Sequence, residues 1–91
     1  MIKAFTGRAT GRVQGVGYRY FAERCARQHS ILGWVRNLPD GSVEFTAVGE
    51  AVDLDAFLLE LKRGPLAGRV ETLDLDWLRD IPDFRDFQIT G

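Results

Sequence analysis

The apolar residues of this chain recur first with the period of a strand and then with the period of a helix, and the change falls on a glycine-rich segment. From Ile2 to Val13 alternate residues share a face, with Phe5 and Ala9 on the apolar side. From Tyr18 to about Gln28 the apolar residues return at helical spacing and form one stripe. A strand that passes directly into a helix predicts a sheet with helices packed on it.

The rest of the chain continues this alternation. The further expected elements are, in chain order, a strand over 33–37, a strand over 42–48, a helix from Asp53 to about Gly64, a strand over 69–78 and a short strand with Phe87 and Ile89. Leu38 to Gly41 is a strong turn signal, and Asp53 is the expected N-cap of the second helix. The order βαββαβ with a short terminal strand predicts an α+β ferredoxin-like sandwich, with two helices packed on one face of an antiparallel sheet. The 91 residues are expected to form a single domain, 1–91.

This topology brings two distant segments together. In the β-α-β unit of such a fold the first and second strands run in the same direction, with the third strand between them. Their carboxyl ends therefore lie at one edge of the sheet. We expect the segment from Gln14 to Arg19 to meet Asn37, at the end of the second strand, at that edge.

The segment between the first strand and the first helix has the composition of an anion-binding loop. Gly15 and Gly17 tolerate φ > 0 and carry no Cβ that would block an anion, so several backbone N–H groups can point into one concave arc. The helix dipole adds its positive end, and Arg19 adds a planar fork that binds phosphate or carboxylate bidentately. The alternative interpretation is an ordinary glycine-rich turn with a surface arginine, because short glycine motifs often match by chance.

The stretches Gly11–Arg19, Gly33–Asn37 and Asp40–Glu44 together resemble the acylphosphatases, and the likeness covers nearly the whole chain. The resemblance implies hydrolysis of the carboxyl–phosphate bond of acyl phosphates to carboxylate and inorganic phosphate, without metal or cofactor. It implies a phosphate-binding segment made of Gln14, Gly15, Val16, Gly17, Tyr18 and Arg19. It implies that Arg19 and Asn37 are the catalytic residues, with Asn37 positioning the attacking water. The implied ligands are a small-molecule acyl phosphate as substrate and inorganic phosphate or sulfate as a product-like ligand.

One position departs from the family pattern in a way that predicts backbone strain. Ser30 stands where the acylphosphatases usually have glycine, at the end of the first helix. A helix often ends with one residue in the left-handed region, and Gly33 comes too late for that role if it opens the next strand. We therefore expect Ser30 to adopt φ > 0.

Composition narrows the possible partners and the compartment. Twelve basic and thirteen acidic residues give a net charge of −1, which favours neither nucleic acid nor an anionic membrane as a partner. No apolar run approaches the roughly 20 residues of a membrane span. One cysteine forms no internal disulfide, so a cytoplasmic location is expected, and we expect a monomer.

Other chemically active side chains have structural interpretations. His29 lacks partners at metal-ligand spacing and is expected to be a partly buried histidine near a helix end. Cys25 lies on the apolar helical stripe and is expected to be a small core residue. Trp34 and Trp77 are expected to fill the core or cover its rim.

Two other classes of function remain open. The same fold hosts RNA-recognition domains, but the strand over 42–48 supplies one aromatic and an acid where such domains need exposed aromatics. The second class is a non-catalytic regulatory or interaction module that keeps the anion-binding loop. A fold alone does not decide between them.

Overall fold

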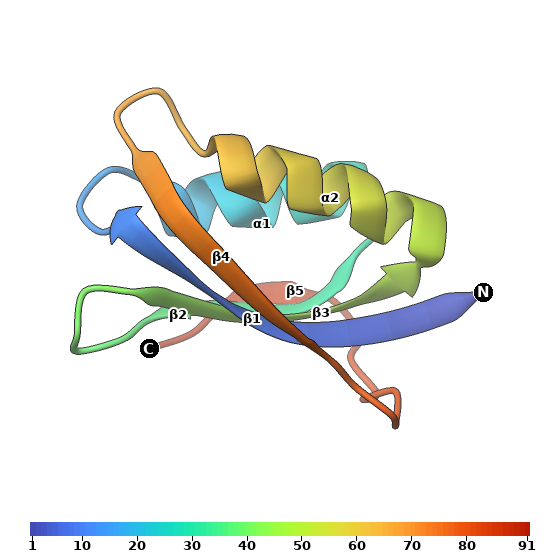
Figure 1. Cartoon of the computed structure of the whole chain (residues 1–91). Coiled ribbons are helices and arrows are strands. Elements are labelled where there is room, and N and C mark those ends of the chain that lie inside the picture. The colour runs from blue at the N-terminus through green and yellow to red at the C-terminus, as the bar shows by residue number, and fades with distance from the viewer.

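The computed structural model describes all residues from 1 to 91, and its elements follow the predicted order (Figure 1). In chain order they are β1 (Ile2–Arg12), α1 (Tyr18–Gln28), β2 (Leu32–Asn37), β3 (Val43–Glu50), α2 (Ala51–Arg63), β4 (Arg69–Trp77) and β5 (Phe87–Ile89). Both helices cover the same face of the sheet and leave the other face open (Figure 1). The predicted α+β ferredoxin-like sandwich is confirmed.

The sheet has five strands in the order β4-β1-β3-β2-β5. The central strand β3 pairs antiparallel with β1 and with β2, so β1 and β2 run in the same direction, as expected. The short strand β5 pairs in parallel with β2, which makes the sheet mixed rather than wholly antiparallel. Residues 78–86 carry the chain from the edge strand β4 to the opposite edge strand β5, which runs antiparallel to β4.

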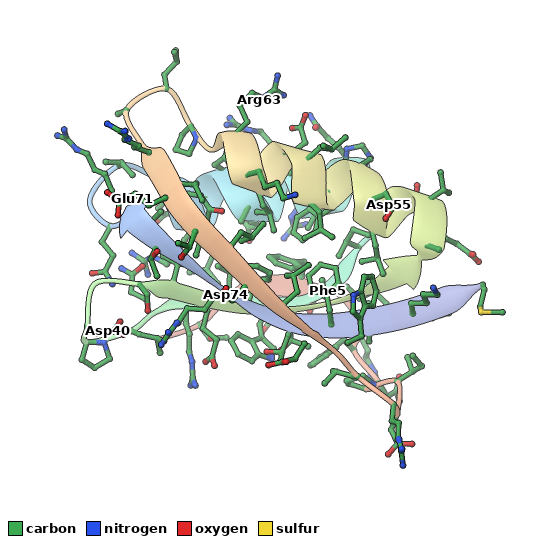
Figure 2. All side chains as sticks on the ribbon, viewed as in Figure 1. Phe5, Asp40, Asp55, Arg63, Glu71 and Asp74 are labelled. Carbon is green, nitrogen blue, oxygen red and sulfur yellow. The ribbon has the colours of Figure 1, made fainter.

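The core lies between the sheet and the two helices. Apart from Tyr18 in its first turn, α1 turns small residues inward, whereas α2 turns large ones inward; they are Ala22, Cys25 and Ala26 on the first helix and Leu54, Phe57 and Leu61 on the second. Phe5 of β1 meets Phe45 of β3 edge to face, with 5.9 Å between ring centroids, and Figure 2 shows Phe5 between the sheet and the helices. Each such fully buried side chain stabilises the fold by about 1.5–3 kcal/mol relative to exposure.

The end of α1 confirms the expectation for Ser30. Ser30 has φ 57 and is the only residue other than glycine with positive φ. The N–H of Ile31 donates to the carbonyl of Ala26 at 2.8 Å, and the N–H of Ser30 donates to that of Arg27 at 3.4 Å. These are the two bonds of a Schellman motif, so Ser30 occupies the position that glycine usually takes.

The start of α2 differs from the prediction. The helix begins at Ala51, with Glu50 at the N-cap position, so the prediction of Asp53 as N-cap is wrong. β3 passes into α2 without a loop, and the N–H of Ala51 donates to the carbonyl of Met1 at 3.1 Å. Asp53 lies instead in the first turn, where a carboxylate is still stabilised by the helix dipole. The other predicted boundaries agree within two residues.

Candidate active site

Strand register brings the two predicted halves of the site to one edge of the sheet. Val43 of β3 lies opposite Ala9 of β1 on one side and opposite Asn37 of β2 on the other. The segment after β1 and the turn between β2 and β3 both lie at the left end of the molecule in Figure 1. Sequence positions more than twenty residues apart therefore become neighbours because β3 aligns the strands that carry them.

The residues 14–19, which we call the cradle loop, leave a row of backbone donors free. Gly15 has φ 73 and Gly17 has φ 79, so both positions need the left-handed region that glycine tolerates. No backbone N–H from Gln14 to Tyr20 donates to a backbone carbonyl. An added Cβ at Gly15 or Gly17 would meet no atom within 4 Å, so the space beside the loop is open. Free backbone donors on a loop with open space beside it are what an anion-binding loop requires.

The electrostatics of α1 add to this arrangement. Gly17 is the N-cap, and the first bond that closes the helix runs from the N–H of Phe21 to the carbonyl of Gly17 at 3.0 Å. The first turn of α1 contains no acidic residue and no capping side chain. The positive end of the helix dipole is therefore not neutralised from within the chain, and it favours an anion at the cradle loop.

Arg19 and Asn37 both have polar groups without partners in the chain. Arg19 lies in the first turn of α1, is partly buried, and takes part in none of the ion pairs of the structure. The Oδ1 atom of Asn37 is buried and has no hydrogen-bond partner. A buried acceptor of this kind costs free energy unless a donor such as water or a ligand meets it.

The side chain of Gln14 joins the cradle loop to the turn that follows Asn37. Its Nε2 atom donates to the carbonyl of Leu38 at 2.8 Å and to the carbonyl of Ser42 at 2.9 Å. The resemblance to the acylphosphatases implies that Gln14 binds phosphate, and it does not imply this contact. No signal in the sequence pointed to it, because the two carbonyls belong to the backbone.

The β2–β3 turn, residues 38–42, is braced internally. Asp40 Oδ1 accepts hydrogen bonds from the Ser42 N–H at 2.9 Å and from the Ser42 hydroxyl at 2.5 Å. These two bonds, with a smaller contribution from the Arg8 guanidinium, hold the pKa of Asp40 below its ordinary value. Figure 2 shows Asp40 in this turn. The spacing of an aspartate two residues before a serine is the sequence signal for such a turn.

The other candidate residues have structural roles. Cys25 is buried, as predicted, and its Sγ donates to Glu60 Oε2 at 3.2 Å. His29 is partly buried at the C-cap of α1, also as predicted. Arg36 pairs with Glu44 at 2.6 Å and lies over the ring of Trp34 at 5.1 Å, on the exposed side of the sheet. No group of three or more His, Cys, Asp or Glu side chains is placed to hold a metal ion.

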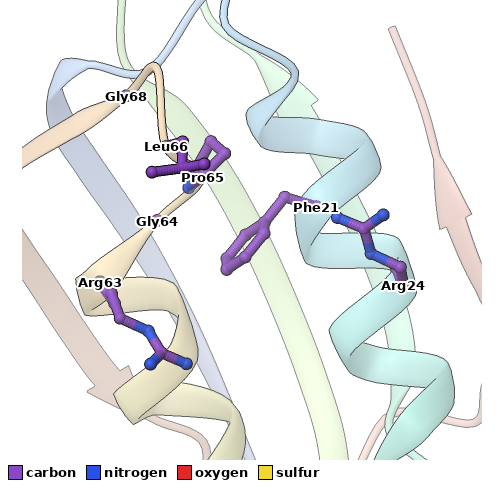
Figure 3. Close-up of a pocket in the computed structure, with 7 residues that line it drawn as sticks. All are labelled: Phe21, Arg24, Arg63, Gly64, Pro65, Leu66 and Gly68. Atoms are coloured by element: carbon purple, nitrogen blue, oxygen red, sulfur yellow. The ribbon is translucent and has the colours of Figure 1, made fainter.

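The largest hollow of the surface lies apart from these residues, between the two helices. It has a volume of about 530 Å³ and is lined by Phe21, Arg24, Arg63, Gly64, Pro65, Leu66 and Gly68 (Figure 3). Its guanidinium groups come from both helices, but none of the free donors of the cradle loop lines it. The candidate site described above is therefore not the largest hollow, and an anion site can be a shallow surface of N–H groups.

Neither helix has the length and apolar character needed to cross a lipid bilayer.

Comparison with known proteins agrees with the geometry. The acylphosphatase family model matches residues 5–89. An acylphosphatase from Salinibacter ruber is 44% identical over 87 residues, which cover 96% of this chain and 92% of that protein. The crystal structure of acylphosphatase from Bacillus subtilis has a TM-score of 0.95 and 33% identity, and the match covers 100% of both chains. The structure of full-length HypF in its phosphate- and nucleotide-bound form has a TM-score of 0.88 and 26% identity, with 100% of this chain but 12% of that chain covered.

The family match and the fold similarity extend over the same residues that form the sheet, the helices and the cradle loop. The chain belongs to the acylphosphatase family, and it is a hydrolase that acts on acyl phosphates.

Proposed function

We propose that the cradle loop and Arg19 bind the phosphoryl group of the acyl phosphate and that Asn37 orients the water that attacks it. The observation that supports this assignment is the row of unpaired N–H groups from Gln14 to Tyr20 at the same edge of the sheet as the unpartnered Oδ1 of Asn37. The N–H groups can donate hydrogen bonds to an anion, and the buried Oδ1 of Asn37 can accept a hydrogen bond from water.

Hydrolysis of an acyl phosphate requires mainly that the water and the phosphoryl group are positioned and that the charge of the transition state is stabilised. Water attacks phosphorus, the bond from phosphorus to the bridging oxygen breaks, and the carboxylate leaves with that oxygen. Charge on the equatorial phosphoryl oxygens is stabilised by the N–H groups and by the two-pronged guanidinium of Arg19. The Asn37 amide accepts a hydrogen bond from the water, but it is too weak a base to take the proton. The proton lost by the water therefore goes to an oxygen of the substrate or to solvent.

The alternative left open by the sequence is a non-catalytic anion-binding module. The fold by itself does not exclude it, because in full-length HypF the same fold occupies 12% of a much larger chain. The two candidates differ in turnover, since a module of this kind binds phosphate without hydrolysing an acyl phosphate.

The test is release of phosphate from a synthetic acyl phosphate such as acetyl phosphate, with and without EDTA. We expect turnover in both conditions. Asn37→Ala should lower kcat with a smaller change in KM, because water orientation matters mainly in the transition state. Gln88→Ala is a suitable control because Gln88 is an exposed amide on β5. Phosphate binding without turnover in the wild type would favour the module, and an effect of Asn37→Ala on KM alone would make Asn37 a substrate-binding group. A cytoplasmic location and a monomeric state stay predictions, to be tested by cell fractionation and sedimentation.

A further inference from the structure

We propose that Gln14 is a positioning residue, which sets the place of Asn37 relative to the cradle loop without touching the substrate through its side chain. This inference rests on the proposed roles of the cradle loop and Asn37. It starts from the two hydrogen bonds that Gln14 Nε2 donates, to the carbonyl of Leu38 at 2.8 Å and to that of Ser42 at 2.9 Å.

The donor capacity of the Gln14 side chain is fully used by these bonds. A glutamine amide has two N–H donors, and both are directed at the β2–β3 turn. The remaining side-chain atom, Oε1, is an acceptor, which does not bind the acceptor oxygens of a phosphate dianion. Only the backbone N–H of Gln14 is therefore left for an anion.

The two carbonyls belong to opposite ends of one rigid turn. The N–H of Leu38 donates to the Ser42 carbonyl at 2.8 Å, and the N–H of Gly41 donates to the Leu38 carbonyl at 3.1 Å. Asp40 closes the turn through its bonds from Ser42. Because Gln14 holds both ends, the turn cannot rotate about a single contact.

Asn37 depends on this turn for its own position. Asn37 is the residue directly before the turn, and its Oδ1 makes no hydrogen bond in the chain. No hydrogen bond at that atom fixes its direction, so its position depends on the backbone on either side of Asn37. One side is β2, which pairs with β3, and the other side is the turn held by Gln14.

The main test is Gln14→Leu, with Gln28→Leu as the matched control on an exposed glutamine at the end of α1. The Leu38 and Ser42 carbonyls keep their bonds from within the turn, so the variant should fold. We expect kcat to fall by about 10- to 100-fold, since a displacement near 1 Å can cost about 10²-fold in rate. The affinity for inorganic phosphate should stay within about twofold of the wild type, because the cradle loop keeps its N–H groups and Arg19. The control should match the wild type in both.

A second variant separates positioning from general damage. In Gln14→Glu the ionised carboxylate faces two carbonyl oxygens and donates nothing, whereas the protonated acid can donate to one of them. We expect its kcat, relative to the wild type at each pH, to recover as the pH falls and the glutamate is protonated. A pH-independent deficit would contradict the proposal.

The remaining readout does not depend on catalysis. The side-chain amide signals of Asn37 in a ¹⁵N NMR spectrum should shift or broaden in Gln14→Leu and not in Gln28→Leu. If the wild type failed to hydrolyse acyl phosphates, the proposed function would be wrong but this spectrum would still test the coupling. Unchanged Asn37 signals, a kcat equal to that of the control, or an equal loss of phosphate affinity and kcat would each overturn the positioning role.

Discussion

The hydroxyl of Tyr18 donates to the carbonyl of Leu61 at 2.7 Å, in the core between the first turn of α1 and the last turn of α2. The helical partner of that carbonyl would be the N–H of residue 65, but residue 65 is proline and has none. Tyr18 thus takes the place of a missing backbone donor. The contact holds Tyr18, which belongs to the cradle loop and begins α1, against the second helix.

Tyr18→Phe should therefore destabilise the protein by about 1–3 kcal/mol, because it leaves a buried carbonyl unpaired while the ring is kept. Urea denaturation measures the change. Tyr20→Phe is the matched control, since the Tyr20 side chain is exposed. Equal free energies of unfolding for the two variants would show that the Leu61 carbonyl finds another donor.

Ser30→Gly should stabilise the protein by up to about 1 kcal/mol, because glycine adopts φ 57 without the Cβ strain that serine carries there. Part of the gain is offset by the larger backbone entropy of glycine in the unfolded chain. Thermal or urea unfolding gives the sign, and kcat should not change. Gly33→Ala is the opposite case, because an added Cβ would lie 1.9 Å from the Thr46 carbonyl oxygen. Gly33→Ala should therefore destabilise the folded protein severely.

Because the thiol of Cys25 is buried, we expect the protein to become less stable at alkaline pH. Burial, together with the hydrogen bond to Glu60, raises the pKa of its thiol from the ordinary 9.0 to about 12. The unfolded chain therefore releases the thiol proton at a lower pH than the folded protein does. The contribution of the buried thiol to the free energy of unfolding is complete below pH 9 and is lost as the pH rises from 9 toward about 12. The stability of Cys25→Ser should fall less steeply over that range in urea titrations. Native Cys25 should also resist a thiol reagent at pH 8 until the protein unfolds, and rapid labelling of the native state would contradict this account.

Arg19→Lys should lower kcat by about 10²–10³-fold while the fold stays intact, because lysine keeps the charge but loses the planar pair of donors. Arg27→Lys provides the control on the same helix, where Arg27 forms an exposed pair with Glu23. Steady-state kinetics and the unfolding midpoint should be measured for both. Turnover of Arg19→Lys near that of the control would remove Arg19 from the mechanism.

Inorganic phosphate or sulfate should raise the melting temperature and inhibit competitively. At about ten times its Kd a ligand of the native state stabilises it by about 1.4 kcal/mol, which for a domain of this size raises Tm by roughly 5–10 °C. A thermal scan with chloride at the same ionic strength is the reference. The shift should shrink in Arg19→Lys, and no shift beyond that of chloride would count against an anion site at the cradle loop.

The order of the elements and the glycine-rich character of the cradle loop can be predicted from local sequence alone. Alternating and helical periods are local properties, and the need for positive φ at Gly15 and Gly17 is a local property too. Even the strained Ser30 followed from local reasoning, because the helix had to end before the next strand began.

The way in which the cradle loop and Asn37 are joined depends on the folded arrangement of the strands, which local sequence does not specify. The parallel pairing of β5 with β2 depends on where the chain crosses the sheet. α2 begins at Ala51, whose N–H donates to the carbonyl of Met1, next to the first residue of the neighbouring strand β1. Gln14 donates to the backbone carbonyls of Leu38 and Ser42. Every residue type has such a carbonyl, so the residues at 38 and 42 give no sign of this contact. Side-chain identity cannot encode which backbone oxygen will lie within reach, because strand register sets that position.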